Sequence, residues 1–165
     1  MSAAYDAAEW SDLFVASAGA TAALAGLLFV AVSINVERIL AFRGLPERAL
    51  EALLVLVAAL VASVFALAPV KDTTLGWLLL ATGVLVTGAA VRLERVSLPE
   101  RHDRSAPATI AQLLLSAVGT LPFAVGGISL IAGAGGGLYW ILVGVVGAVL
   151  AAALNAWVLM IEILR

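Results

Sequence analysis

The chain has 165 residues, of which 64% are hydrophobic and only 12% charged, and its formal net charge is −2. Soluble domains carry about 25% charged residues, so this composition excludes an ordinary water-soluble fold. The chain lacks cysteine and has no basic stripe outside short loops, which excludes disulfides and thiol chemistry and gives no sign of nucleic-acid binding.

Five long apolar runs follow one another along the chain. Runs of about 20 apolar residues satisfy their backbone hydrogen bonds in lipid only as helices. We therefore predict an all-α, polytopic bundle that forms a single transmembrane domain over residues 1–165. The predicted spans are residues 13–36, 49–70, 75–91, 108–132 and 138–161.

An acidic segment precedes the first span. Asp6, Glu9 and Asp12 occur there without any lysine or arginine, whereas a cleaved signal peptide begins with a basic region. We therefore expect this segment to lead directly into the first span. If copies of that span surrounded a pore, the three carboxylates would form an acidic outer mouth.

The first span carries two stripes at helical spacing. One is small and includes Gly19, Ala22 and Gly26. The other is polar at its ends and apolar in its middle, which allows two interpretations. It either packs against other helices, as small-residue faces do in lipid, or lines a pore with Leu24 and Leu28 as a hydrophobic gate. We favour packing. The second stripe includes Ser17, Thr21, Leu24, Leu28, Asn35 and Arg38.

The same span carries two resemblances. Residues 10–15 and 22–35 resemble a group of small multi-pass membrane proteins, mostly actinobacterial and with largely uncharacterised activities. Residues 24–32 are weakly similar to the pore helix of the Orai calcium channels, over about half of one helix. The selectivity glutamate of that family would fall at Ile34, and the predicted orientation is opposite, so calcium selectivity is not implied.

The arginines predict the orientation. All eight lie in the loops after the first and third spans or at the C-terminus, whereas Lys71 lies on the other side. By the positive-inside rule the N-terminus lies outside and the C-terminus inside. Tyr5, Trp10, Trp77, Tyr139 and Trp140 fall at the predicted outer boundary, where aromatic anchors are common.

The two arginine-bearing loops also share a pattern. Glu37-Arg38 and Leu45-Pro46-Glu47-Arg48 in one correspond to Glu94-Arg95 and Leu98-Pro99-Glu100-Arg101 in the other. A duplicated helical hairpin, spans one and two with spans three and four, would produce this pattern. The common composition of such loops would produce it equally well, and the apolar spans do not obviously align.

The last two spans carry the remaining polar and irregular features. Pro122 removes one helix hydrogen bond and predicts a kink. Ser33, Gln112 and Asn155 fall at similar depths in three different spans, which predicts an interhelical polar cluster. We expect effectively no ionisable residue within the spans.

These features predict the function only coarsely. With no nucleophile–base pair and no ligand cluster, we expect neither an enzyme nor a bound cofactor or metal. We expect a multi-pass protein of a bacterial plasma membrane whose partners are lipids and other membrane helices, either copies of itself or a larger complex. The favoured role is an oligomerising assembly or accessory subunit, and the alternative is a homo-oligomeric pore lined by the first span.

Overall fold

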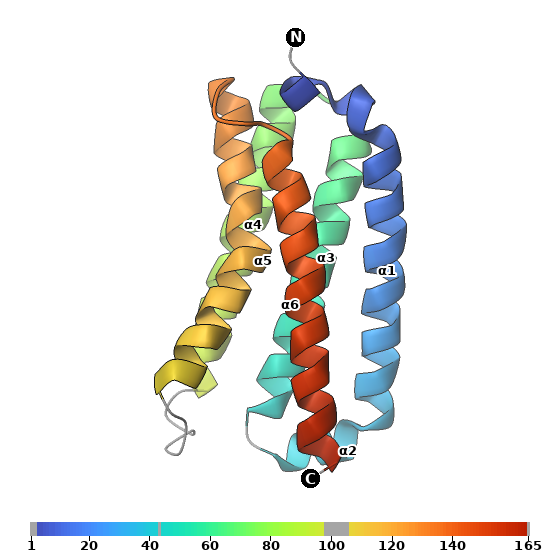
Figure 1. Ribbon diagram of the computed structural model, residues 1–165, viewed down its shortest axis with the longest axis vertical. Helices are drawn as coiled ribbons and strands as arrows, with labels where there is room; N and C mark the ends of the chain where they lie inside the picture. The colour runs from blue at the N-terminus through green and yellow to red at the C-terminus, as the bar shows by residue number, and fades with distance from the viewer. Residues whose placement is uncertain (1–2, 43, 98–105, 165) are drawn as a thin grey trace.

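The computed structural model describes residues 3–42, 44–97 and 106–164, and the regular secondary structure in this part of the chain is all helical (Figure 1). Five of its helices are long and apolar enough to cross a membrane, as the sequence predicted. Together they have the architecture of a multi-pass membrane protein. The elements are η1 Ala3–Tyr5, η2 Ala7–Trp10, α1 Ser11–Ile34, α2 Val36–Ala41, α3 Leu45–Leu67, α4 Asp72–Ser97, α5 Ala106–Ala132 and α6 Tyr139–Leu164.

The helix ends differ from the predicted spans most at the end of α4, which runs to Ser97 instead of residue 91, and they also differ on either side of α2. The first long helix stops at Ile34, and the short helix α2 follows, which the hydropathy pattern did not reveal. Gly44 then adopts a left-handed conformation with φ of 82°, and Pro46 occupies the first turn of α3. Because proline suits a first helical turn, α3 begins at Leu45 and brings Glu47 and Arg48 into the helix instead of the loop.

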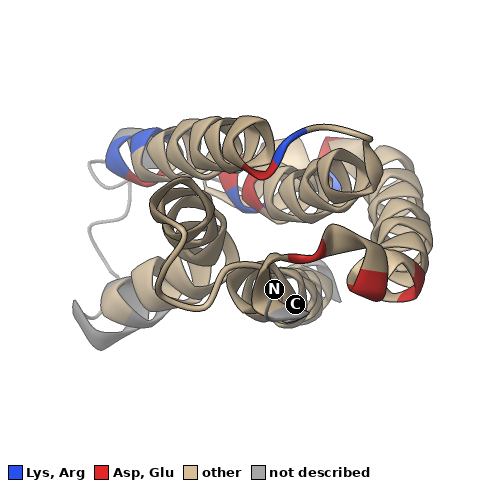
Figure 2. Cartoon of the chain, turned by 90° about the horizontal axis from the view of Figure 1, so that it is seen from above, with Lys and Arg blue, Asp and Glu red and all other residues tan. Residues whose placement is uncertain are grey.

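The helix α3 lies at the centre of the bundle and packs against α1, α4, α5 and α6. Half of its buried residues are alanine, including Ala52, Ala59 and Ala62, which allows its neighbours to approach closely. The helix α1 packs chiefly on α3 and lies at one edge of the bundle in both the side view and the view from above (Figures 1 and 2).

Glycines close the contact between α4 and α5. A Cβ atom on Gly76 would lie 2.9 Å from the carbonyl oxygen of Gly127, and one on Gly127 would lie 2.6 Å from the backbone nitrogen of Leu80. A Cβ atom on Gly83 would collide with the backbone of Ala124. We call Gly76, Gly83, Ala124 and Gly127 the α4–α5 seam. Because the obstacles are backbone atoms, the two helices can meet this closely only without side chains there.

The end of the bundle that carries the N-terminal segment is tied together by backbone and aromatic contacts. The Leu138 N–H donates to the Ala4 carbonyl at 2.8 Å, and the Gly136 N–H donates to the Tyr5 hydroxyl at 3.2 Å. Trp10 packs edge-on against Tyr139, with 4.7 Å between ring centroids. We call this the tryptophan end, and the opposite end, with α2 and the start of α3, the arginine end.

The proposed duplication receives no support from these elements. Glu37 and Arg38 lie in the separate helix α2, whereas Glu94 and Arg95 lie within the continuous helix α4. The second copy of the Leu-Pro-Glu-Arg motif, residues 98–101, lies outside the described residues.

Candidate functional site

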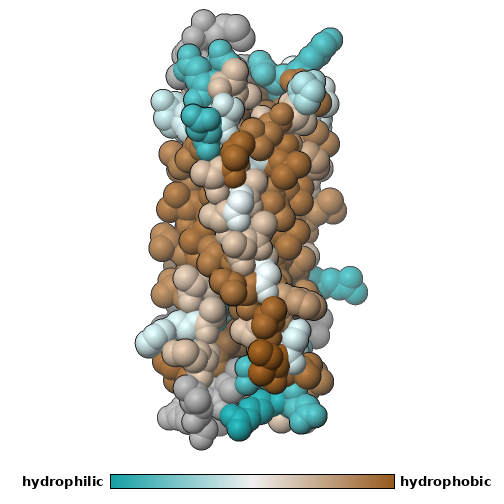
Figure 3. All heavy atoms as spheres, turned by 90° about the vertical axis from the view of Figure 1, so that its right-hand side faces the viewer, coloured by the Kyte–Doolittle hydropathy of each residue, from teal (hydrophilic) through white to brown (hydrophobic). Residues whose placement is uncertain are grey.

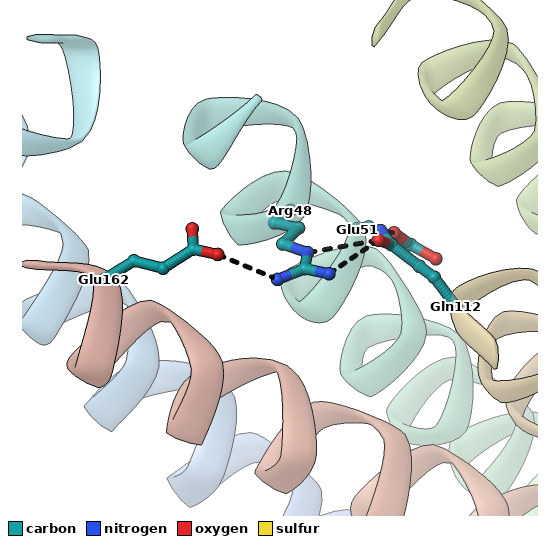
Figure 4. A network of polar contacts seen from close by, with 4 residues as sticks. All are labelled: Arg48, Glu51, Gln112 and Glu162. Atoms are coloured by element: carbon teal, nitrogen blue, oxygen red, sulfur yellow. Dashed lines mark hydrogen bonds and ion pairs between the residues drawn. The ribbon is translucent and has the colours of Figure 1, made fainter. Parts of the chain in front are cut away.

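Four polar side chains form a network inside the arginine end, drawn in Figure 4. The Arg48 guanidinium donates from Nε and Nη2 to Oε1 of Gln112, at 3.1 and 2.8 Å. The Gln112 amide nitrogen donates in turn to Oε2 of Glu51 at 3.0 Å. Nη1 of Arg48 lies 3.6 Å from Oε1 of Glu162. These contacts connect α3, α5 and α6, and we call the four residues the arginine network.

Three of the four members of the arginine network are buried, two of them ionisable, whereas the Glu162 side chain is 36% exposed. Relative exposure is 8% for Arg48, 2% for Glu51 and 5% for Gln112. A charged group in such surroundings is costly unless a partner compensates it, and the carboxylate nearest to the guanidinium is that of Glu162, on α6, at 3.6 Å. One carboxylate oxygen of Glu51, Oε1, is buried without a hydrogen-bond partner in the part of the chain that the structure describes.

The expectation that the spans contain no ionisable residue is therefore wrong. Glu51 lies in the second turn of α3, and Arg48, which the sequence assigned to a loop, lies in its first turn. Glu94, in the last turns of α4, is also buried. The signal was present in the sequence: Arg48 and Glu51 are three residues apart, so their side chains lie on one face once the helix starts at Leu45.

The predicted cluster of Ser33, Gln112 and Asn155 does not form as expected. Gln112 is buried at a helix interface, but it bonds to Arg48 and Glu51. The Ser33 hydroxyl donates to the Phe29 carbonyl of its own helix at 2.8 Å, and its side chain is exposed. Asn155 is buried on α6. Equal depth was a poor guide because it ignores the rotation of α1 about its axis, which turns Ser33 outward.

The first-span stripe divides between the interior of the bundle and its surface. Ser17, Thr21 and Leu28 are buried, and the Thr21 hydroxyl donates to the Ser17 carbonyl at 2.6 Å. Leu24 is exposed at 39%, and Arg38 is exposed on α2. The partly buried Asn35 donates to the Ala31 carbonyl at 2.9 Å. Within one chain, the buried members of the stripe therefore lie in the contact between helices.

The opposite face of α1 is open. Ala16, Gly19, Ala23 and Gly26 recur at intervals of three or four residues, and all four are exposed. A Cβ atom on Gly19 or Gly26 would meet nothing within 4 Å. Gly19 and Gly26 each lie two residues before a buried residue, about 200° around the helix from it. We call these four residues the open row.

The surface on this side of the molecule is apolar between two polar ends. Figure 3 shows it as a mostly brown band in which a paler column runs along the long axis. Among the large side chains of α1, Val15, Leu27 and Phe29 are more than half exposed, at 59%, 68% and 62%. The face is therefore suited to lipid or to another apolar helix.

The remaining predicted sites are the acidic segment before α1 and Pro122, and their contacts do not indicate a function. Asp6 caps η2 by accepting from the Ala8 N–H at 3.1 Å, and Glu9 and Asp12 are exposed. Seen from above, acidic residues gather on the segment that enters α1 (Figure 2). Pro122 is buried inside α5, which continues through it without interruption.

No family model, curated protein or solved structure matches this chain. Among the described residues, no group of histidine, aspartate or glutamate side chains is arranged to hold a metal ion. The candidate sites are thus defined by their contacts alone: a buried polar network that joins three helices, and an open small-residue face on a fourth.

Proposed function

We propose that this chain is a non-enzymatic membrane protein that assembles through the open row of α1, with a second copy of itself as the partner. The observation that carries the proposal is the empty space around Gly19 and Gly26. Glycine within a helix costs about 0.5–1 kcal/mol relative to alanine, so an unused glycine row is unfavourable for an isolated helix. Close approach by another helix would offset that cost.

The burial of the helices supports the same face. Only 17% of the membrane window of α1 is buried, compared with 50% for α3 and for α5. A row of small residues can pack against an identical row in a symmetric dimer, which is a common solution for helices in lipid. This arrangement supports a second copy as the partner.

The proposed setting is a bacterial plasma membrane, with the N-terminus outside. Four arginines lie at the arginine end: Arg38 in α2, Arg48 in the first turn of α3, and Arg92 and Arg95 in the last turns of α4. Lys71 precedes α4 at the tryptophan end. The positive-inside rule would place the arginine end in the cytoplasm. Single-site labelling of spheroplasts at each end would test this orientation.

Single-cysteine cross-linking tests the assembly, because the chain has no native cysteine. Ala23→Cys places a thiol in the middle of the open row, and Leu85→Cys places one on α4, where Leu85 is 71% exposed. In membranes, we expect an oxidant to produce disulfide-linked dimers from Ala23→Cys at low protein density. Equal cross-linking at both positions, or none at Ala23→Cys, would contradict assembly through the open row.

A second variant separates packing from proximity. Leucine at Gly19 and Gly26 would fill the row, and because a Cβ atom at either position meets nothing within 4 Å, we expect the monomer to fold normally. Gly88→Leu is the matched control, since a Cβ atom on Gly88, in α4, also meets nothing within 4 Å. We expect energy transfer between labelled copies in liposomes to fall only for the α1 variant. Energy transfer that persists would exclude the row as the contact, and a wild-type monomer would favour a different membrane partner.

A further inference from the structure

A groove between α3 and α4 at the arginine end combines an apolar wall with two opposite charges. Its volume is about 520 Å³, which falls within the range of roughly 300–1,000 Å³ that is usual for small-ligand pockets. We call it the α3–α4 groove. The residues that line it are Glu47, Leu50, Leu54, Gly88, Ala89, Arg92 and Leu93.

The groove lies where the bilayer changes from hydrocarbon to headgroups. Glu47 is in the first turn of α3, at the arginine end. Arg92 is twenty residues beyond Asp72, the first residue of α4. At 1.5 Å per residue this is about 30 Å, the thickness of the hydrocarbon core. The charged part of the groove is thus at headgroup depth, and Leu50, Leu54 and Gly88 lie deeper along the same two helices.

The two charges of the groove do not neutralise each other. Glu47 and Arg92 line the same groove. In the described structure, no nitrogen of Arg92 lies within 4.0 Å of a carboxylate oxygen of Glu47, so no ion pair joins them. The helix dipole favours a carboxylate at the position of Glu47. Its oxygen Oε2 is nevertheless buried and has no hydrogen-bond partner among the described residues. The groove is therefore lined by a partly buried carboxylate, Glu47, and by an exposed guanidinium, Arg92, that do not pair with each other.

We propose that the α3–α4 groove binds a phospholipid with a primary-ammonium headgroup, namely phosphatidylethanolamine. Its ammonium group donates to Glu47, and its phosphate accepts from Arg92, as guanidinium groups bind phosphate oxygens. One acyl chain lies against Leu50, Leu54 and the bare backbone at Gly88. The choice of lipid follows from the charges, because a headgroup with an amine and a phosphate on a short linker complements one carboxylate and one guanidinium. The site is separate from the open row of α1 and does not depend on the proposed assembly.

Lipid binding to the delipidated full-length protein tests this site. Native mass spectrometry would compare phosphatidylethanolamine, phosphatidylcholine and phosphatidylglycerol with identical acyl chains. We expect phosphatidylethanolamine to bind about tenfold more tightly than phosphatidylcholine, whose quaternary ammonium cannot donate a hydrogen bond. Equal binding of all three lipids would overturn the proposal. Preferred binding of phosphatidylglycerol would show phosphate recognition alone and would overturn the ammonium assignment.

Variants assign the two contacts separately. Glu47→Gln should reduce phosphatidylethanolamine binding to the level of phosphatidylcholine, whereas Arg92→Gln should weaken the binding of all three lipids. Gly88→Leu should also weaken all three, because its side chain would enter the groove without touching the protein. Glu37→Gln and Arg38→Gln are matched controls on α2, where both residues are exposed, and should bind like the wild type. An unchanged preference in Glu47→Gln, with the fold intact by circular dichroism, would refute the site.

Discussion

Glycines occur in opposite surroundings in the α4–α5 seam and in the open row of α1. In the seam, a Cβ atom on Gly83 or Gly127 would meet the backbone of the partner helix. In the open row, a Cβ atom on Gly19 or Gly26 would meet nothing within 4 Å. The spacing of small residues is similar in both places, but only the seam has its partner within the chain. A small-residue row in a membrane helix therefore indicates a contact without indicating whether that contact is internal or external.

The effect that tests this contrast most directly is expected at Gly83. Gly83→Ala should force α4 and α5 apart, because the obstacle is the Ala124 backbone, and should destabilise the fold by about 1–3 kcal/mol. Gly88→Ala, five residues further along α4 and in open space, is the matched control. Thermal unfolding in detergent would measure both variants. Equal melting temperatures would show that the seam is not as tight as described.

A second effect on stability is expected in the arginine network, where polar side chains join the helices. Gln112→Leu removes both hydrogen bonds from Arg48 to Gln112 and the bond from Gln112 to Glu51. Because these bonds involve charged and buried groups, we expect a loss of about 1.5–3 kcal/mol in unfolding free energy. Asn35→Leu is the control, since the Asn35 amide bonds only within its own helix in the described contacts. If the two variants lose the same stability in chemical denaturation, the arginine network does not hold α3 and α5 together.

The smallest effect, of opposite sign, is expected in the open row. Gly26→Ala adds a methyl group in open space and should stabilise the detergent-solubilised monomer by about 0.5–1 kcal/mol, since alanine favours helix more than glycine. The same change should weaken association in liposomes, where the row would be in contact. A destabilised monomer would mean that Gly26 already has a partner within the chain, and the contrast with Gly83 would fail.

Much of the architecture could be predicted from local sequence. The five spans follow from runs of apolar residues, because lipid leaves the backbone no alternative to helix. Two predictions failed for related reasons. Glu51 was overlooked because it lies close to a span end, and Ser33 was grouped with Gln112 by depth alone. Hydropathy averages over all sides of a helix, so it could not show that Glu51 faces inward and Ser33 outward.

The sequence by itself determined the number of spans, the concentration of arginine at one end and the small-residue stripe of α1, since each depends only on residue type and spacing. The tertiary structure alone decided which rows are occupied. Gly127 is covered because α4 returns beside α5, whereas Gly19 is open because α1 rests on α3 with its opposite face. Tertiary structure also joined Arg48 to Gln112, which are 64 residues apart, because helix rotation and long-range packing depend on the whole bundle at once.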